Sequence, residues 1–204
     1  LFLMPNTAFR DYRGGGRSSA RETIGRVAAG AIAAKLLKEM GISILTYTKS
    51  IGPVTIDPRH FDAAQISQNP VAMPDAHAAK EAQTFLDCCI AQQDSSGGII
   101  ECVITGVPAG IGDPVFDKLD ASLAKAIFSI GAVKGFEIGD GFAAATARGS
   151  ENNDSFVPQE NAPLTKATNH AGGILWRACS DGCPLLFSVP LSNLLHPLRS
   201  YNIP

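Results

Sequence analysis

Helical and extended patterns alternate along this chain, and the alternation limits the folds that it can adopt. Apolar residues recur every three or four positions over residues 20–40, 77–93 and 117–130, which predicts three amphipathic helices. Alternating, β-branched or aromatic residues predict strands over 42–47 and 99–105. Because helix stripes and sheet faces must bury their apolar sides against another element, the pattern predicts a layered fold of the α+β or α/β class.

The second half of the chain gives weaker signals. Short strands are predicted over 133–138 and 142–148, separated by a Gly139-Asp140-Gly141 hairpin turn. Residues 150–166 are polar and without period, so we expect a long loop there. From Leu191 onward little pattern remains, and no regular element is predicted.

Size, charge and cysteine content exclude several classes of protein. The chain has 204 residues, 45% hydrophobic and 18% charged, which predicts one globular domain without a membrane span. A formal net charge of −2 argues against a nucleic-acid partner, because such domains carry a basic excess. An odd cysteine count fits a reducing cytoplasm. No metal site is expected, since Cys179 and Cys183 have no second ligand pair at suitable spacing.

The strongest local motif is a run of three glycines, residues 14–16, followed by Arg17, Ser18 and Ser19. Glycine lets a ligand approach the backbone, and the amides and dipole of a helix N-terminus favour negative charge. Ser19 and Glu22 have the spacing of a capping box, in which the Ser19 hydroxyl accepts from the Glu22 amide. The motif predicts a site for a multiply charged anion, with a flexible loop of solvated arginines as the alternative.

Longer stretches of the sequence resemble one enzyme family. The signature blocks of chorismate synthases are similar, in order and spacing over residues 10–175, to RDYRGGGRSSARET, RVAAGAIA, GVPAGIGDPVFDKLDA, SIGAVKGFEIGDGF, RGSENND and NHAGGIL. The resemblance implies a layered β-α-β sandwich of the chorismate synthase type. It also implies a carbon–oxygen lyase of the shikimate pathway and aromatic amino-acid biosynthesis, cytoplasmic and homotetrameric. This enzyme eliminates phosphate from 5-enolpyruvylshikimate 3-phosphate to give chorismate, using reduced FMN.

Carried over residue by residue, the resemblance places five residues among the flavin contacts. They are Arg17, Ser18 and Ser19 in the glycine motif and Gly131 and Ala132 in SIGAVKG. A cap hydroxyl can accept from the backbone and still donate its own proton to a ligand, so both roles of Ser19 are compatible. Without the resemblance, Gly131 and Ala132 are typical of small residues that end a helix.

No catalytic residue is assigned from the sequence. The family's two proton-delivering histidines lie in an amino-terminal part that has no match here. His170, in NHAGGIL, is interpreted as mainly structural. Trp176 stands where the family has a small residue beside the flavin.

The chain is identified as an internal piece of a chorismate synthase, a single incomplete domain (1–204). Residues 10–190 are family-like, and 191–204 form an atypical tail. Leu191–Leu198 stand where the family has FKPTSSIK, whose lysine and hydroxyls reach the flavin. Codons that can encode LSNLLHPL give that string when read two nucleotides later, so a frameshift is the hypothesis, and resequencing the DNA tests it.

Three possibilities stay open for the isolated chain. The first is an enzyme segment with little or no turnover of its own. The second is a non-catalytic remnant that binds flavin or phosphate. The third is an inactive gene fragment that does not fold stably, because exposed core faces would lack their partner layers.

Overall fold

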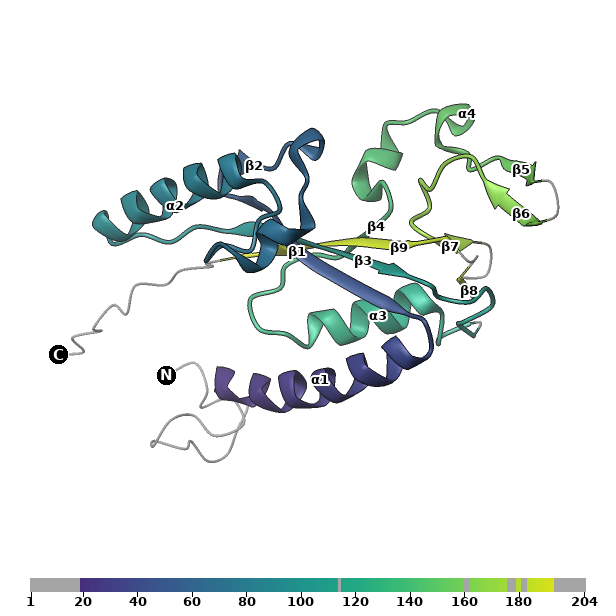
Figure 1. Ribbon diagram of the computed structural model, residues 1–204, viewed down its shortest axis with the longest axis horizontal. Coiled ribbons are helices and arrows are strands. Elements are labelled where there is room, and N and C mark those ends of the chain that lie inside the picture. The colour runs from purple at the N-terminus through teal and green to yellow at the C-terminus, as the bar shows by residue number, and fades with distance from the viewer. Residues whose placement is uncertain (1–18, 114, 160–161, 176–178, 181–182, 193–204) are drawn as a thin grey trace. The chain divides into compact units, whose positions relative to one another are not determined.

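The computed structural model describes residues 19–113, 115–159, 162–175, 179–180 and 183–192 (Figure 1). The chain divides into two compact units, Leu1–Met40 and Gly41–Pro204. Described helices of the first unit are the 3-10 helix η2 (Ala20–Glu22) and helix α1 (Thr23–Glu39). All described strands belong to the second unit.

Helix α1 matches the helix predicted between residues 20 and 40, although its first turn is the 3-10 helix η2. No residue of α1 is buried. Four of its apolar side chains are more than 60% exposed: Ile24, Val27, Ile32 and Leu36. The predicted helix is therefore present, and among the described residues of its unit none covers these apolar side chains.

A five-stranded antiparallel sheet organises the second unit, in the order β2-β1-β3-β9-β4. Its strands are β1 (Ser43–Ile51), β2 (Val54–Thr55), β3 (Gly98–Thr105), β4 (Glu137–Ile138) and β9 (Leu185–Leu191). Antiparallel pairing throughout, with helices packed on the sheet, gives the α+β form of the predicted layered class.

Helix α2 (Ala76–Ala91) packs on one face of this sheet and closes the larger hydrophobic core. Ala82 and Leu86 of α2 meet Tyr47 of β1 and the fully buried Met73. Between β2 and α2 the chain forms the 3-10 helices η3 (Pro58–His60) and η4 (Ala63–Ser67). Helix α2 confirms the helix predicted over 77–93.

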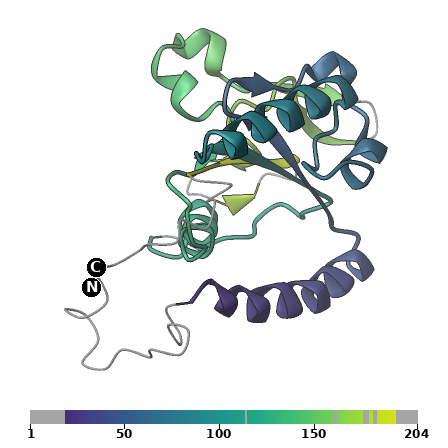
Figure 2. The ribbon, with the colours of Figure 1, turned by 90° about the vertical axis from the view of Figure 1, so that its left-hand side faces the viewer.

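Helix α3 (Leu119–Phe128) lies on the opposite face of the sheet from α2 (Figure 2). Ile127 packs there against a second core of Cys102, Phe187 and Val189. Both α3 and β3 confirm predicted elements, with bounds that differ by one or two residues. The two faces of the sheet thus have separate cores.

The weaker sequence signals led to two wrong predictions and one missed strand. The strand expected over 142–148 is the 3-10 helix η5 (Gly141–Ala145). The loop expected over 150–166 contains helix α4 (Gly149–Asn152) and the hairpin β5 (Phe156–Gln159) to β6 (Ala162–Lys166). Strand β9 was not predicted at all. A further small hairpin pairs β7 (Ile174–Leu175) with β8 (Cys179–Ser180).

Candidate functional site

Of the glycine motif, the structure describes Ser19 onward, and Arg17 and Ser18 lie outside the described residues. Ser19 is the N-cap of η2, and its hydroxyl accepts from the Arg21 amide at 3.3 Å. The predicted capping box is therefore wrong in detail. In a 3-10 turn the Glu22 amide bonds instead to the Ser19 carbonyl, at 3.1 Å.

Gly131 and Ala132 form a turn after α3, in the second unit, and both are exposed. Ala132 has a φ of 69°. This left-handed conformation costs a non-glycine residue roughly 1–2 kcal/mol. A Cβ built on Gly131 would meet nothing within 4 Å, and Gly131 does not have a positive φ. The chain itself therefore gives no steric reason for glycine at this position.

The Gly131–Ala132 turn is attached to the end of strand β9. The Ala132 carbonyl accepts from the Ser192 amide at 3.0 Å and from the Ser192 hydroxyl at 3.4 Å. Two residues later the Lys134 amide donates to the Pro190 carbonyl at 2.9 Å. Within the described part of the chain, the amides of Gly131 and Ala132 donate to no backbone carbonyl. Among the described residues, the turn thus has two amide donors without a backbone acceptor, on a backbone held by Ser192 and Pro190.

The structure brings Ala132 together with Ser192, at the start of the tail predicted to be atypical. Ser19 lies in the other unit, so the predicted flavin contacts are described as two separate groups. Sequence reasoning did not name Ser192 as a site residue.

Two polar clusters inside the second unit were also missed. In the Glu101 cluster, buried Glu101 of β3 accepts from the Tyr47 hydroxyl, from Lys49 Nζ and, at 3.2 Å, from the Ser188 hydroxyl. Burial acts to raise the pKa of Glu101, but the hydrogen bonds from Lys49 and Tyr47 outweigh it and hold that pKa below its usual value. Burial, with the bond to Glu101, raises the pKa of Tyr47.

The Asp154 cluster joins segments far apart in sequence, and consists of Asp140, Asp154, Thr168, His170 and Ala171. One carboxylate oxygen of buried Asp154 accepts from the Thr168 hydroxyl at 2.7 Å and the His170 amide at 2.8 Å. The other accepts from the Ala171 amide at 3.0 Å. Burial acts to raise the pKa of Asp154, but these donors stabilise the charged form and lower it to about 2.

His170 contributes to this cluster through its backbone and its ring. Its Nδ1 lies 2.6 Å from an Asp140 carboxylate oxygen, and its carbonyl accepts from the Asp140 amide at 2.9 Å. Gly139 crosses the same segment so closely that a Cβ on it would lie 1.9 Å from the His170 carbonyl oxygen. These contacts agree with the structural interpretation of His170.

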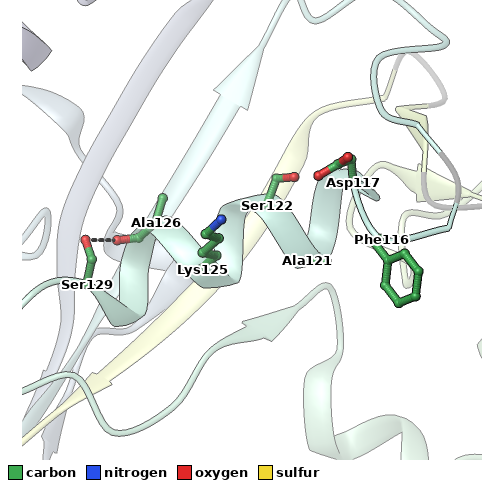
Figure 3. Close-up of a pocket in the computed structure, with 7 residues that line it drawn as sticks. All are labelled: Phe116, Asp117, Ala121, Ser122, Lys125, Ala126 and Ser129. Atoms are coloured by element: carbon green, nitrogen blue, oxygen red, sulfur yellow. Dashed lines mark hydrogen bonds between the residues drawn. The ribbon is translucent and has the colours of Figure 1, made fainter.

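One hollow of about 620 Å³ runs along the outer side of α3 (Figure 3). Phe116 stands at its start and Ser129 at its end, with Lys125 between them. The Ser129 hydroxyl is engaged, donating to the Ala126 carbonyl at 2.6 Å. Neither Gly131 nor Ala132 lines this hollow.

Among the residues that the structure describes, no three His, Cys, Asp or Glu side chains are grouped so as to hold a metal ion. No helix formed by these described residues is both long and apolar enough to cross a membrane.

The fold is that of a mixed helix-and-sheet protein, with the exposed Gly131–Ala132 turn next to its central sheet. A family model described as "Chorismate synthase" matches residues 4–203. The chain belongs to the chorismate synthase family.

Curated relatives agree with this assignment. The chain is 64% identical over 179 residues to the chorismate synthase of Lachnoclostridium phytofermentans and 63% identical to that of Agathobacter rectalis. Each match covers 88% of this chain and 48% of the relative. The chain therefore spans about half the length of the curated relatives it matches.

A solved structure titled "Crystal Structure of Chorismate Synthase" has a similar fold. It superposes with a TM-score of 0.80 at 30% sequence identity, covering 87% of this chain and 56% of the solved chain. The predicted layered fold of the chorismate synthase type is thereby confirmed.

Proposed function

We propose that this chain carries the flavin-binding part of a chorismate synthase. The reaction is the elimination of phosphate from 5-enolpyruvylshikimate 3-phosphate to give chorismate, a carbon–oxygen lyase step of aromatic biosynthesis. Support comes from the family match over residues 4–203 and from relatives that carry this name at up to 64% identity.

The observation that carries the flavin site is the open Gly131–Ala132 turn. Gly131 has free space where a side chain would stand, and Ala132 has a left-handed backbone. Strained backbone is found preferentially at ligand sites, where the surrounding structure holds it. Two available amides are suited to the carbonyl and nitrogen acceptors of a flavin ring. We assign Gly131 and Ala132 as flavin contacts.

Arg17, Ser18 and Ser19 are the second group of contacts in this proposal. The Ser19 hydroxyl accepts from the Arg21 amide, which leaves its proton for a ligand. Arg17 would supply a guanidinium for phosphate or carboxylate. When bound, reduced FMN would supply an electron-rich ring that stabilises charge as phosphate leaves.

The proposal places the enzyme in the cytoplasm as a homotetramer, without a nucleic-acid or membrane partner. Support for assembly comes from α1, whose apolar side chains Ile24, Val27, Ile32 and Leu36 are exposed. Apolar surface of this kind on a helix is stable when another protein layer covers it. Sedimentation of the protein expressed with its full-length coding sequence tests the tetramer.

FMN titration of the chain, followed by flavin fluorescence, tests the proposed site. Gly131→Ala should weaken binding about tenfold or more, because a methyl group would occupy the space left for the ring. The matched control is Gly149→Ala, since Gly149 also has open space around it and no positive φ. The control should bind FMN as the unchanged chain does.

Turnover is measured in the same samples with reduced FMN and 5-enolpyruvylshikimate 3-phosphate. We expect FMN binding without chorismate, because no histidine of this chain matches the family's two proton donors. Chorismate formation would show that the chain carries the whole reaction. A chain that folds but does not bind FMN would contradict the proposal.

A further inference from the structure

The carbonyl of Ala132 receives two hydrogen bonds from one residue. The Ser192 amide donates to it at 3.0 Å and the Ser192 hydroxyl at 3.4 Å. A peptide oxygen has two lone pairs, so Ser192 can use the whole acceptor capacity of this carbonyl. Ala132 is also one of three non-glycine residues with positive φ among those the structure describes. Ala132 therefore has both a carbonyl that accepts two hydrogen bonds and a strained backbone.

We propose that Ser192 is a positioning residue that holds Ala132 in its left-handed conformation and so sets the affinity for flavin. This inference rests on the proposed flavin contact at Gly131 and Ala132. Ser192 acts through Ala132 and does not itself touch the cofactor.

Of the two donors of Ser192, only the hydroxyl depends on the identity of the side chain. The amide bond continues the pairing of β9 with the segment before β4, where Val133 bridges to Leu191 and Lys134 bonds to Pro190. Any residue except proline can make that bond. Only a hydroxyl or a similar donor adds the second one, and this second bond opposes rotation of the peptide group that follows Ala132.

Fixing this peptide group has a direct consequence for the turn. The Ala132 carbonyl defines ψ of Ala132, so holding it keeps the residue out of the more favourable right-handed region. The amides of Gly131 and Ala132 then keep one arrangement before any ligand arrives. Such preorganisation raises affinity because less order has to be imposed on binding.

FMN affinity of three variants tests the proposal. Ser192→Ala keeps the amide bond and removes the hydroxyl, and should weaken FMN binding roughly three- to tenfold. Ser192→Thr restores a hydroxyl at the same position and should bind within about twofold of the unchanged chain. In an Ala132→Gly background, Ser192→Ala should have almost no effect, because glycine adopts positive φ without strain.

A flavin-free measurement keeps this test separate from the proposed function. The three-bond coupling between HN and Hα of Ala132 reports its φ, and it should move toward an averaged value in Ser192→Ala but not in Ser192→Thr. If the unchanged chain binds no FMN, the flavin proposal fails, while the coupling still decides whether Ser192 positions Ala132. An unaltered coupling in Ser192→Ala, or unaltered FMN affinity in a chain that binds FMN, would overturn the inference.

Discussion

The Asp154 cluster and the Gly131–Ala132 turn are two irregular regions of the second unit, and they differ in how their polar groups are used. In the Asp154 cluster the carboxylate is buried and both of its oxygens accept hydrogen bonds. Backbone crosses backbone there, with no room for a side chain on Gly139. In the Gly131–Ala132 turn, space is open and two amides remain available within the described chain.

This difference predicts that the Asp154 cluster contributes to stability and that the Gly131–Ala132 turn contributes to ligand binding. The Asp154 cluster stabilises the folded chain without a ligand, because both oxygens of its buried carboxylate already accept hydrogen bonds. An open turn with held strain gains most when a ligand arrives. A glycine-to-alanine substitution should therefore lower the free energy of unfolding in the Asp154 cluster. In the Gly131–Ala132 turn it should weaken ligand binding and leave stability nearly unchanged.

Gly139→Ala should show the largest loss of stability. The new Cβ would overlap the His170 carbonyl oxygen, and φ of +57° is unfavourable for alanine. The free energy of unfolding should fall by about 3 kcal/mol or more in urea denaturation. A loss below about 1 kcal/mol would show that the two backbones can separate easily.

Acid should lower the free energy of unfolding through the Asp154 cluster, and it should do so between about pH 4 and pH 2. The pKa of Asp154 is lowered from 3.8 to about 2 in the folded chain. Its contribution of about 2 kcal/mol is therefore present above pH 4 and is lost as pH falls toward 2. Urea denaturation between pH 2 and 6 measures it.

Asp154→Asn is the control for that pH dependence. Glu101, Asp57 and Asp75 also have lowered pKa values and contribute to acid sensitivity, so only the difference between the two proteins isolates Asp154. Identical pH dependence in both proteins would contradict the assignment.

Tyr47→Phe tests the Glu101 cluster with a smaller expected effect. The variant removes the Tyr47 hydroxyl and leaves Lys49 and Ser188 as donors to the buried Glu101 carboxylate. We expect a loss of about 1–2 kcal/mol in thermal or urea unfolding. FMN affinity should not change, and a large change would link this cluster to the ligand site.

Gly131→Ala should have the smallest effect on stability. The added methyl group meets no atom, and alanine restricts the unfolded chain more than glycine does. The free energy of unfolding should stay within about 0.5 kcal/mol of the unchanged chain or rise slightly. Together with weaker FMN binding, this result would separate the open turn from the closed cluster. A loss comparable to that of Gly139→Ala would remove the distinction.

Much of the fold follows from local pattern. Helices α1, α2 and α3 and strands β1 and β3 all lie where the sequence predicts them, although β1 continues to Ile51, past the predicted end. Strand β9 also carries an alternating signal in Leu185, Phe187 and Val189, all buried. Pro190 within the strand and Pro184 just before it are unfavourable for a strand, and no strand is predicted there from the sequence. Because β9 lies between β3 and β4, missing it meant missing the order of the sheet.

The candidate site was less accessible to sequence reasoning. Gly131 and Ala132 were named through a family resemblance, whereas their attachment to Ser192 depends on strand pairing across 60 residues. Glu101 offered a usable signal, since a carboxylate in the middle of an apolar strand must find donors when it is buried. Asp154 gave none, because its donors lie 12 to 17 residues further along the chain and two of them are backbone amides.

The place of β9 in the sheet also affects how the chain is made. Strand β3 ends at Thr105, and its partner β9 begins at Leu185, about 80 residues later. At roughly 5–20 residues per second, one edge of β3 stays open on the ribosome for about 4–16 s. An open, apolar strand edge can pair with other chains during that time. The interval before β9 emerges is therefore a stage of synthesis at which pairing of β3 with another chain competes with folding.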